Sequence, residues 1–354
     1  MVLRYRPSAR YSHRVVSYFL KLAVWEPFRY AERLVDRVRA EARVLPQDPV
    51  FILGYYRSGT THLQELLMQD PSFGYMNFFQ CFFSTAFNST ERWIKPIFER
   101  IIRASGFLHP AHQIPFSFEL PGEEDVSLVS SGWRLAANWG QIFPQSFREI
   151  YAKTGLLEGI SDEELAEFKA TYHDLIWRVS KANGHKRLLL KSPPNTGRLA
   201  LLAEMYPNAK FLFIRRDPYD VFASNKKLWN SFSQTWFEDV DAQTSREHIL
   251  WSYERSHAAY ERDKGLLAPG RLFEVSFEDF IRSPLDTAEA VYEALDLGDF
   301  HAVEGRFSDF IDRAHKSSAK PYSLSDQEVD AVNTGLGKWL IQWAYAFRGL
   351  RRAA

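Results

Sequence analysis

A glycine-rich loop at residues 54–61, Gly-Tyr-Tyr-Arg-Ser-Gly-Thr-Thr, has the composition and spacing of an anion-binding site. It follows the apolar run 49–53, which predicts a buried strand, and precedes the periodic segment 62–68, which predicts a helix. In such a unit, backbone N–H groups point into the loop and the helix dipole favours negative charge. The loop amides of Ser58, Gly59, Thr60 and Thr61, with the three hydroxyls, are therefore predicted to hold a phosphate.

One position separates this loop from those of ATP and GTP enzymes. After the second glycine those loops carry Lys and then Ser or Thr, whereas this chain has Thr60 and Thr61. The lysine that would hold a γ-phosphate is missing, and a different cation, Arg57, lies inside the loop. We therefore predict a site for a phosphate, but not for a triphosphate with magnesium.

Two further apolar runs end in cations. The run 187–191 ends at Lys191 before Ser-Pro-Pro, and the run 210–214 is followed by Arg-Arg-Asp-Pro and a new helix that carries Ser224. Because the carboxyl ends of parallel strands lie at one edge of a sheet, we expect Arg57, Lys191 and Arg216 to converge there. Arg215 alternates to the opposite side of its strand, so Arg216 is favoured as the ligand-binding arginine.

Together, the Arg-Ser-Gly-Thr-Thr loop, the Leu-Lys-Ser-Pro strand end and the Arg-Asp-Pro-x-Asp-Val-x-x-Ser element resemble sulfotransferases that use 3′-phosphoadenosine 5′-phosphosulfate, above all a bacterial branch of them. The likeness extends more loosely from Pro49 to Leu297. It implies that Arg57 lies near the bridging oxygen of the donor, with Lys191 as a second cation. It also implies that Arg216 and Ser224 hold the 3′-phosphate, and that no metal is required.

The general base is the least defined part of the predicted site. Some relatives place a Glu shortly after the first helix, but here that region reads Tyr-Met-Asn-Phe-Phe, without a carboxylate. Candidates come from two segments, residues 120–125 and residues 109–112. Glu123 is the first choice and His112 the second, and Glu124, Asp125 and His109 stay open. A histidine has a suitable pKa without any shift, whereas a glutamate needs burial among apolar groups.

The elements that must position these residues follow an alternating pattern. Strands are predicted at 187–191, 210–214 and 271–275, and helices at 197–206, from 219, and at 284–296. This pattern predicts an α/β, P-loop-NTPase-like, mainly parallel sheet with helices on both faces. Residues 78–186 are aromatic and mostly helical in pattern, with helices expected at 91–105, 124–132, 145–153 and 162–182. We expect this helical insertion to form the acceptor side of a domain spanning 48–354.

Residues 1–47 form a separate basic segment, with a helix expected from Ser12 to Arg43. Its first 25 residues carry five cations and no acid, mixed with aromatic residues. Such a helix either lies on an anionic membrane surface or packs on the domain and shows solvent its basic face. The single cysteine of the chain fits a reducing cytoplasm, which is the expected location, and this segment adds a peripheral position at the inner face of the membrane as an alternative.

Composition restricts the remaining function classes. Net charge is +0 at pH 7, so no global field attracts nucleic acid, and the single cysteine, Cys81, excludes an intrachain disulfide framework. The sequence has no membrane-spanning apolar run. The leading hypothesis is sulfuryl transfer to a hydroxyl of a small, apolar acceptor such as a sterol, phenol, lipid alcohol or secondary metabolite. A P-loop kinase using ATP and a non-catalytic nucleotide-binding or membrane-docked scaffold are the alternatives.

Overall fold

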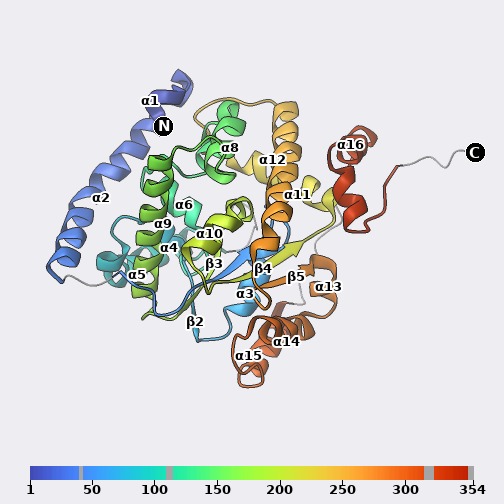
Figure 1. The fold of residues 1–354 in the computed structure, drawn as a ribbon. Coiled ribbons are helices and arrows are strands. Elements are labelled where there is room, and N and C mark those ends of the chain that lie inside the picture. The colour runs from blue at the N-terminus through green and yellow to red at the C-terminus, as the bar shows by residue number, and fades with distance from the viewer. Residues whose placement is uncertain (40–42, 109–114, 315–322, 350–354) are drawn as a thin grey trace, which may run out of the picture.

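A five-stranded parallel sheet with strand order β2-β3-β1-β4-β5 forms the centre of the protein in a computed structural model (Figure 1). The structure describes residues 1–39, 43–108, 115–314 and 323–349. The strands are β1 (Val50–Leu53), β2 (Phe73–Gly74), β3 (Arg187–Lys191), β4 (Lys210–Arg215) and β5 (Leu272–Ser276). In the central strand, Phe51 is in register with Leu190 of β3 and Phe211 of β4. All neighbouring strands run parallel, so their carboxyl ends share one edge.

Both faces of the sheet are buried, because alternate residues of each strand pack against different helices. Phe51 and Leu53 face one apolar cluster, whereas Val50 and Ile52 face another. The first face is covered by α9 (Asp162–Ala182), α10 (Leu199–Met205) and α12 (Ala242–Asp263), and the second by α3 (Thr60–Leu67), α13 (Phe277–Arg282), α14 (Pro284–Leu295) and α15 (Glu304–Ala314). The predicted fold class is confirmed.

The helical insertion between the first and third strands has the predicted character. It contains α4 (Phe78–Phe82), α5 (Phe87–Ser105), α6 (Glu124–Ser130), α7 (Trp139–Ile142), α8 (Phe147–Gly155) and α9. The predicted bounds of α9 are confirmed, because Ser161 and Glu164 form a capping box that fixes its first turn. The predicted strand 187–191 also has the bounds of β3.

A third apolar cluster lies beside the glycine loop. It joins Tyr55 and Tyr56 to α8, to α11 (Pro218–Phe232), to α12 and to α16 (Asp326–Gln342). The hydroxyl of Tyr55 contacts the Ser252 hydroxyl at 2.7 Å, and the hydroxyl of Tyr56 donates to Asn138 Oδ1 at 2.9 Å. The two loop tyrosines therefore anchor the loop to the helices around it.

The N-terminal helix α2 (Ser12–Arg39), which follows the short α1 (Val2–Tyr5), packs along one side of the domain (Figure 1). It ends before Arg43, the predicted end, which lies outside the helix. The Tyr18 hydroxyl donates to the Val129 carbonyl at 2.7 Å, and the Trp25 and Phe83 rings lie edge to face with centroids 4.6 Å apart. These contacts attach α2 to the insertion.

The expectation that a packed N-terminal helix shows solvent its basic face holds for Arg33 of α2, which is exposed, but not for the first two cations of the helix. Arg14 donates to the carbonyls of Ser233 and Trp236, both at 2.8 Å, and therefore points toward the domain. Lys21 is partly buried, with its ammonium 5.5 Å from the centre of the Phe82 ring. The side of α2 that faces away from the domain is mainly apolar instead.

Among the described helices, none combines the length and the apolar character needed to cross a bilayer.

Candidate functional site

The glycine loop connects β1 to α3 through two positions that only glycine fits. Gly54 has a φ of 150° and Gly59 a φ of 98°. A Cβ at Gly54 would lie 2.6 Å from the Ile214 carbonyl oxygen, and one at Gly59 would lie 2.3 Å from a ring carbon of Phe277. The loop is also tied to the adjacent turn, because the Gly54 N–H donates to Thr196 Oγ1 at 2.8 Å.

The loop presents donors that suit a phosphate. Ser58 is buried, and its hydroxyl has no hydrogen-bond partner among the described residues. Gly59 occupies the N-cap position of α3 and provides no side-chain cap for its first turn. Because buried hydroxyl and N–H groups are nearly always satisfied, these groups indicate an acceptor such as a phosphate oxygen. The residues present thus fit the 5′-phosphate of the expected donor.

Arg57 is held in a left-handed backbone conformation, with a φ of 68°. This conformation costs an L-residue about 1 kcal/mol or more, so the fold maintains it against local preference. The Arg57 Nε donates to Ser224 Oγ at 2.8 Å, and the Arg57 carbonyl accepts from Arg216 Nη1 at 3.3 Å. Three residues predicted from separate segments therefore meet in one place.

Arg216 is also supported from a second side, where its guanidinium carbon lies 4.3 Å from the centre of the Phe277 ring. Its Nε is buried and has no hydrogen-bond partner within the described residues. Asp217 accepts from the Tyr219 N–H at 2.8 Å, so it caps α11 as expected for a turn residue. Asp220 lies 3.7 Å from the Arg216 guanidinium.

Lys191, the last residue of β3, forms an ion pair with Glu123. The Lys191 side chain is 3% exposed and that of Glu123 is 22% exposed, so the pair lies at a boundary between interior and solvent. Glu123 occupies the N-cap position of α6, and its carbonyl accepts from the Cys81 thiol at 3.4 Å. Lys191 and Glu123, predicted as the second cation and the base, are thus brought into contact.

The three adjacent acids of residues 123–125 have three different environments. The Asp125 carboxylate is fully buried and accepts from Arg198 at 2.6 and 3.0 Å and from the Ala137 N–H at 2.7 Å. Glu124 is also buried, but its two carboxylate oxygens have no partner among the described residues. Burial raises the pKa of Glu124 to about 8, and the charge of Asp125 adds to the effect. Only Glu123 is partly exposed.

His109 and His112, the remaining candidates for the base, lie outside the described residues.

Two contributors to the site were not found by sequence reasoning. Arg198 follows the Lys-Ser-Pro-Pro element and forms a buried ion pair with Asp125. A prediction that Asp125 is buried would have indicated that a cation must lie beside it. Lys21 reaches the insertion from α2, and burial lowers its pKa to about 8 while Cys81 lies near it. No periodicity in the sequence indicated that an N-terminal lysine would lie close to Cys81 and Phe82.

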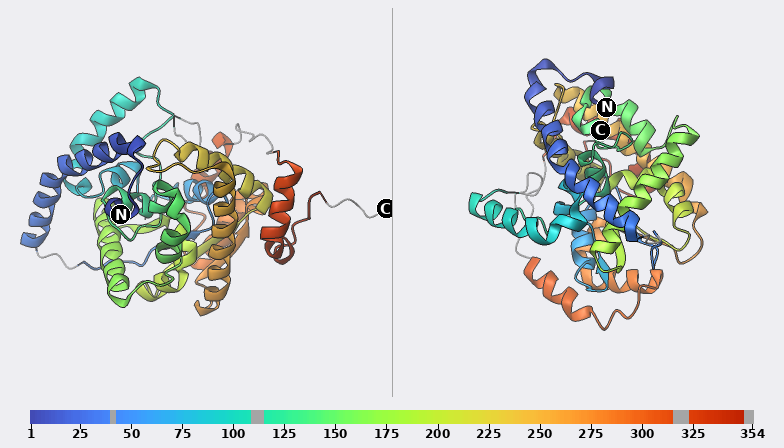
Figure 2. Two further views of the ribbon diagram at one scale, coloured as in Figure 1. Left: turned by 90° about the horizontal axis from the view of Figure 1, so that it is seen from above. Right: turned by 90° about the vertical axis from the view of Figure 1, so that its left-hand side faces the viewer.

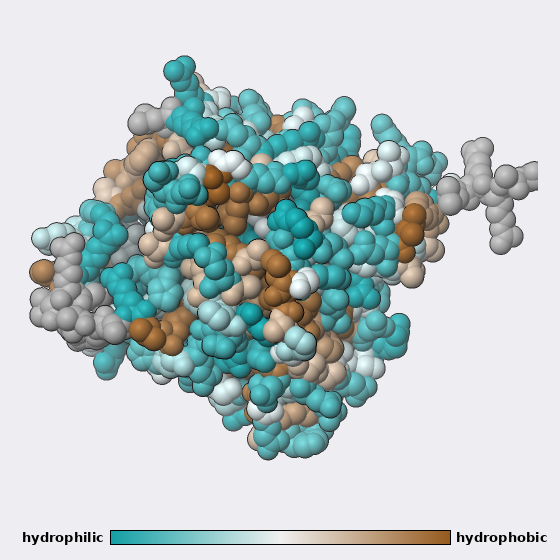
Figure 3. Space-filling view, in the orientation of Figure 1, coloured by the Kyte–Doolittle hydropathy of each residue, from teal (hydrophilic) through white to brown (hydrophobic). Residues whose placement is uncertain are grey.

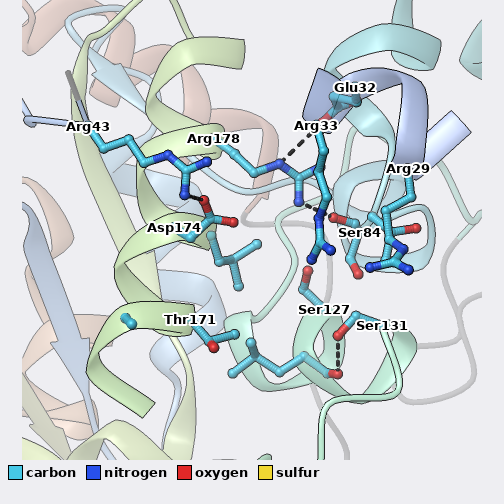
Figure 4. A pocket seen from close by; sticks show the side chains of 14 residues that line it. Arg29, Glu32, Arg33, Arg43, Ser84, Ser127, Ser131, Thr171, Asp174 and Arg178 are labelled. Carbon is cyan, nitrogen blue, oxygen red and sulfur yellow. Dashed lines mark hydrogen bonds and ion pairs between the residues drawn. The ribbon is translucent and has the colours of Figure 1, made fainter. Parts of the chain in front are cut away.

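A separate polar pocket of about 400 Å³ lies between α2, α6 and α9 (Figure 4). Its charges are largely paired, since Arg178 bonds Glu32 at 2.6 Å and Arg43 pairs with Asp174. The residues that line it do not include those predicted to bind the donor or the acceptor. It is therefore not the candidate active site.

A sequence model of the sulfotransferase family matches residues 49–301 of the chain. The omega-hydroxy-beta-dihydromenaquinone-9 sulfotransferase Stf3 of Mycobacterium bovis is 25% identical over 330 residues, which cover 92% of this chain and 80% of that protein. The protein of the same name from Mycobacterium tuberculosis matches equally.

Solved structures have the same fold. The sulfotransferase STF9 of Mycobacterium avium superposes with a TM-score of 0.66 at 17% identity, covering 90% of this chain and 82% of that chain. The sulfotransferase STF1 of Mycobacterium tuberculosis superposes with a TM-score of 0.59 at 16% identity, covering 90% and 83%.

Proposed function

The chain belongs to the sulfotransferase family, and we propose that it moves the sulfuryl group of 3′-phosphoadenosine 5′-phosphosulfate to a hydroxyl of a small, apolar acceptor. One observation carries this proposal above the others. Arg57, Arg216 and Ser224 come from the loop, from the residue after β4 and from α11, and they meet within hydrogen-bond distance beside the glycine loop. A donor with two separate phosphates requires such a double site.

The donor would be held at both ends by charge-assisted hydrogen bonds. Ser58, Thr60, Thr61 and the amides around Gly59 would bind the 5′-phosphate at the start of α3. Arg216 and Ser224 would bind the 3′-phosphate, which ordinary nucleotides lack. With Thr60 in the position of the usual lysine, the loop lacks the lysine that holds a γ-phosphate in ATP and GTP enzymes.

The donor supplies an activated sulfuryl group, and the residues of this chain would supply charge and a base. Arg57 and Lys191 would neutralise the negative charge that grows on the leaving phosphate, as fixed cations do in phosphoryl transfer. An arginine cannot act as an acid at neutral pH, so the role of Arg57 would be electrostatic. Glu123 would accept the proton of the acceptor hydroxyl while the acceptor oxygen bonds to sulfur and the bond to the bridging oxygen breaks.

Geometry favours Glu123 over its two neighbours as the base. Asp125 is engaged by Arg198, and Glu124 is enclosed on all sides, whereas Glu123 is partly exposed and is held in place by Lys191. A base must reach the acceptor hydroxyl, and this requirement excludes a fully enclosed carboxylate.

The acceptor is proposed to be apolar because a group of phenylalanine rings lies beside the segment that carries Glu123, where the Phe78 N–H donates to the Leu120 carbonyl. Phe78, Phe82, Phe116 and Phe118 form a contiguous cluster with ring centroids 5.3 to 6.5 Å apart. Phe82 directly follows Cys81, whose thiol donates to the Glu123 carbonyl. The Stf3 proteins, named for a hydroxylated menaquinone, support a hydroxylated lipid as the first acceptor to try.

The proposal is tested by calorimetric titration with 3′-phosphoadenosine 5′-phosphate, ATP, ADP and AMP, followed by transfer of labelled sulfate to a panel of alcohols and phenols. We expect the 3′-phosphorylated nucleotide to bind tightest and label to reach a long-chain alcohol without magnesium. Preference for ATP with magnesium-dependent phosphate transfer would replace the proposal by a kinase. Donor binding without transfer to any acceptor would indicate a scaffold.

A further inference from the structure

The outward face of α2 is apolar along most of its length. Its side chains that point away from the domain include six large ones that are 43 to 61% exposed. They are Val16, Leu20, Val24, Phe28, Leu34 and Val35. Most residues between them are small or aromatic, and the charged Glu26 and Arg33 are also exposed. The cations Arg14 and Lys21 point the other way, toward the protein. Figure 3 shows this apolar strip at the upper left of the molecule.

This arrangement is the reverse of an ordinary surface helix. A helix packed on a globular domain normally turns its apolar side inward and its charges outward. Exposed apolar patches of more than a few hundred Å² are rare on monomeric proteins and mark sites of interaction. The outward face of α2 therefore needs a partner.

A second exposed apolar stripe runs along α5. Trp93, Ile97 and Ile101 are spaced by four residues, so they lie on one side of the helix, and they are 57 to 69% exposed. Arg92, Arg100 and Arg103 are exposed beside them. The acids of α5 face the protein instead, because Glu91 binds Lys95 at 2.8 Å and Glu99 binds the Ser117 hydroxyl at 2.9 Å. The stripe is thus bordered by positive charge.

The two stripes belong to one side of the molecule. Glu32 of α2 accepts from the N–H and the hydroxyl of Ser89 in α5, both at 3.0 Å, so the helices meet. The left view of Figure 2 shows α2 and α5 together at the margin of the molecule, and in both views α5 projects beyond the rest. Phe82, beside Lys21, is 36% exposed, so the phenylalanine cluster near Glu123 reaches the surface here.

We propose that α2 and α5 form a docking surface for an anionic lipid bilayer, into whose interfacial region both apolar stripes insert. Apolar and aromatic side chains flanked by arginines are what the boundary between head groups and acyl chains accommodates. A second copy of the chain fits less well, because a two-fold interface on α5 would place its own arginines together. A bilayer meets both stripes without such repulsion.

Docking on a bilayer would place the phenylalanine cluster where an apolar acceptor is dissolved. This access of the acceptor rests on the proposed function. The docking itself rests only on the exposed apolar stripes of α2 and α5. A hydroxylated lipid could then reach Glu123 past Phe82 and Lys21 without crossing water, which apolar solutes enter unfavourably.

The test is flotation of the full chain with vesicles of phosphatidylcholine and phosphatidylglycerol at about a 7:3 ratio, beside vesicles of phosphatidylcholine alone. A double variant, Leu20→Glu with Val24→Glu, should lower partition by about tenfold to hundredfold. Trp93→Glu should lower it likewise. The matched control is Leu266→Glu with Ile341→Glu, at apolar positions that are 67 and 72% exposed elsewhere, and it should bind as the parent does.

The arginines are tested by Arg100→Gln with Arg103→Gln, which should reduce the preference for anionic vesicles. Arg262→Gln with Arg282→Gln removes the same charge from exposed positions elsewhere and should leave that preference intact. The proposal would be overturned if the parent did not float with anionic vesicles. It would also be overturned if the α2 and α5 variants floated as well as the parent. A third contrary result would be a parent protein that is a dimer, does not bind vesicles, and becomes a monomer in the Leu20→Glu, Val24→Glu variant. None of these readouts involves turnover or donor, so they stand apart from the nucleotide titration.

Discussion

Replacing Glu124 by glutamine should stabilise the protein at neutral and alkaline pH. Its carboxylate is buried without a hydrogen-bond partner among the described residues, and burial raises its pKa from the ordinary 4.5 to about 8. The folded state therefore favours the protonated form, whereas the unfolded chain ionises it. Glutamine has nearly the same shape and never ionises, so the substitution removes this cost without opening a cavity.

The magnitude follows from the two pKa values. Glu124 binds its proton more tightly in the folded state than in the unfolded state. The free energy of unfolding is therefore not reduced by Glu124 below pH 4.5, and it falls as the pH rises from 4.5 toward 8. At about 1.4 kcal/mol per pH unit, the cost of Glu124 grows to about 3 kcal/mol at pH 7 and levels off near 5 kcal/mol above pH 8. Glu124→Gln should thus equal the parent near pH 4 and exceed it by about those amounts at higher pH.

The assay is urea unfolding followed by tryptophan fluorescence at several pH values, with the variant-minus-parent difference cancelling other titrations. Turnover measured in parallel separates stability from chemistry: Glu124→Gln should keep most of the transfer rate, whereas Glu123→Gln should lose it with donor binding intact. A difference that does not grow with pH would refute the neutral, buried state of Glu124. Loss of transfer in Glu124→Gln but not in Glu123→Gln would move the base to Glu124.

Three further predictions concern the donor site and its support. Arg216→Ala should weaken binding of 3′-phosphoadenosine 5′-phosphate by about tenfold to a hundredfold and leave AMP binding nearly unchanged in calorimetry. Equal losses for both ligands would make Arg216 structural. Arg57→Ala should lower turnover far more than it raises the donor Kd, because charge on the bridging oxygen grows only in the transition state, and Arg57→Lys should keep much of the rate. Normal turnover of Arg57→Ala at saturating donor would exclude this role. Asp125→Asn should destabilise the fold by about 3–5 kcal/mol in urea unfolding, since it leaves the buried Arg198 uncompensated, and Arg198→Met in the same chain should restore part of this loss. An unchanged unfolding midpoint would show that the pair contributes nothing.

Elements with strong local signals were predicted closely. β3 and α9 have the predicted bounds, because an apolar run and a capping box are encoded by neighbouring residues. The two-residue strand β2 was not predicted, since its pairing with Arg187 and Leu188 defines it more than its own composition. Helix α12 was missed although Asp241 caps its start, because its many polar residues give weak apolar periodicity.

The orientation of α2 shows a limit of periodicity. The apolar spacing of this segment indicates a helix but not its buried side: Val15 and Trp25 pack against the core, whereas Phe19 and Leu34 are half exposed. The helix carries apolar residues around most of its circumference, so spacing alone could not select the side that packs. Contacts with residues more than a hundred positions away, such as Val129, made that choice.

The sequence alone was enough to predict a mainly parallel sheet, the glycine loop and the cations at the carboxyl ends of the strands. Each of these features is encoded by residues within a short segment. The tertiary structure decided the states of Glu123, Glu124 and Asp125, which adjoin in sequence but meet Lys191, an apolar interior and Arg198, respectively. Successive residues of a helix point about 100° apart, so neighbours in sequence face different surroundings. Their protonation and pairing depend on burial and on distant partners, which one-dimensional spacing does not encode.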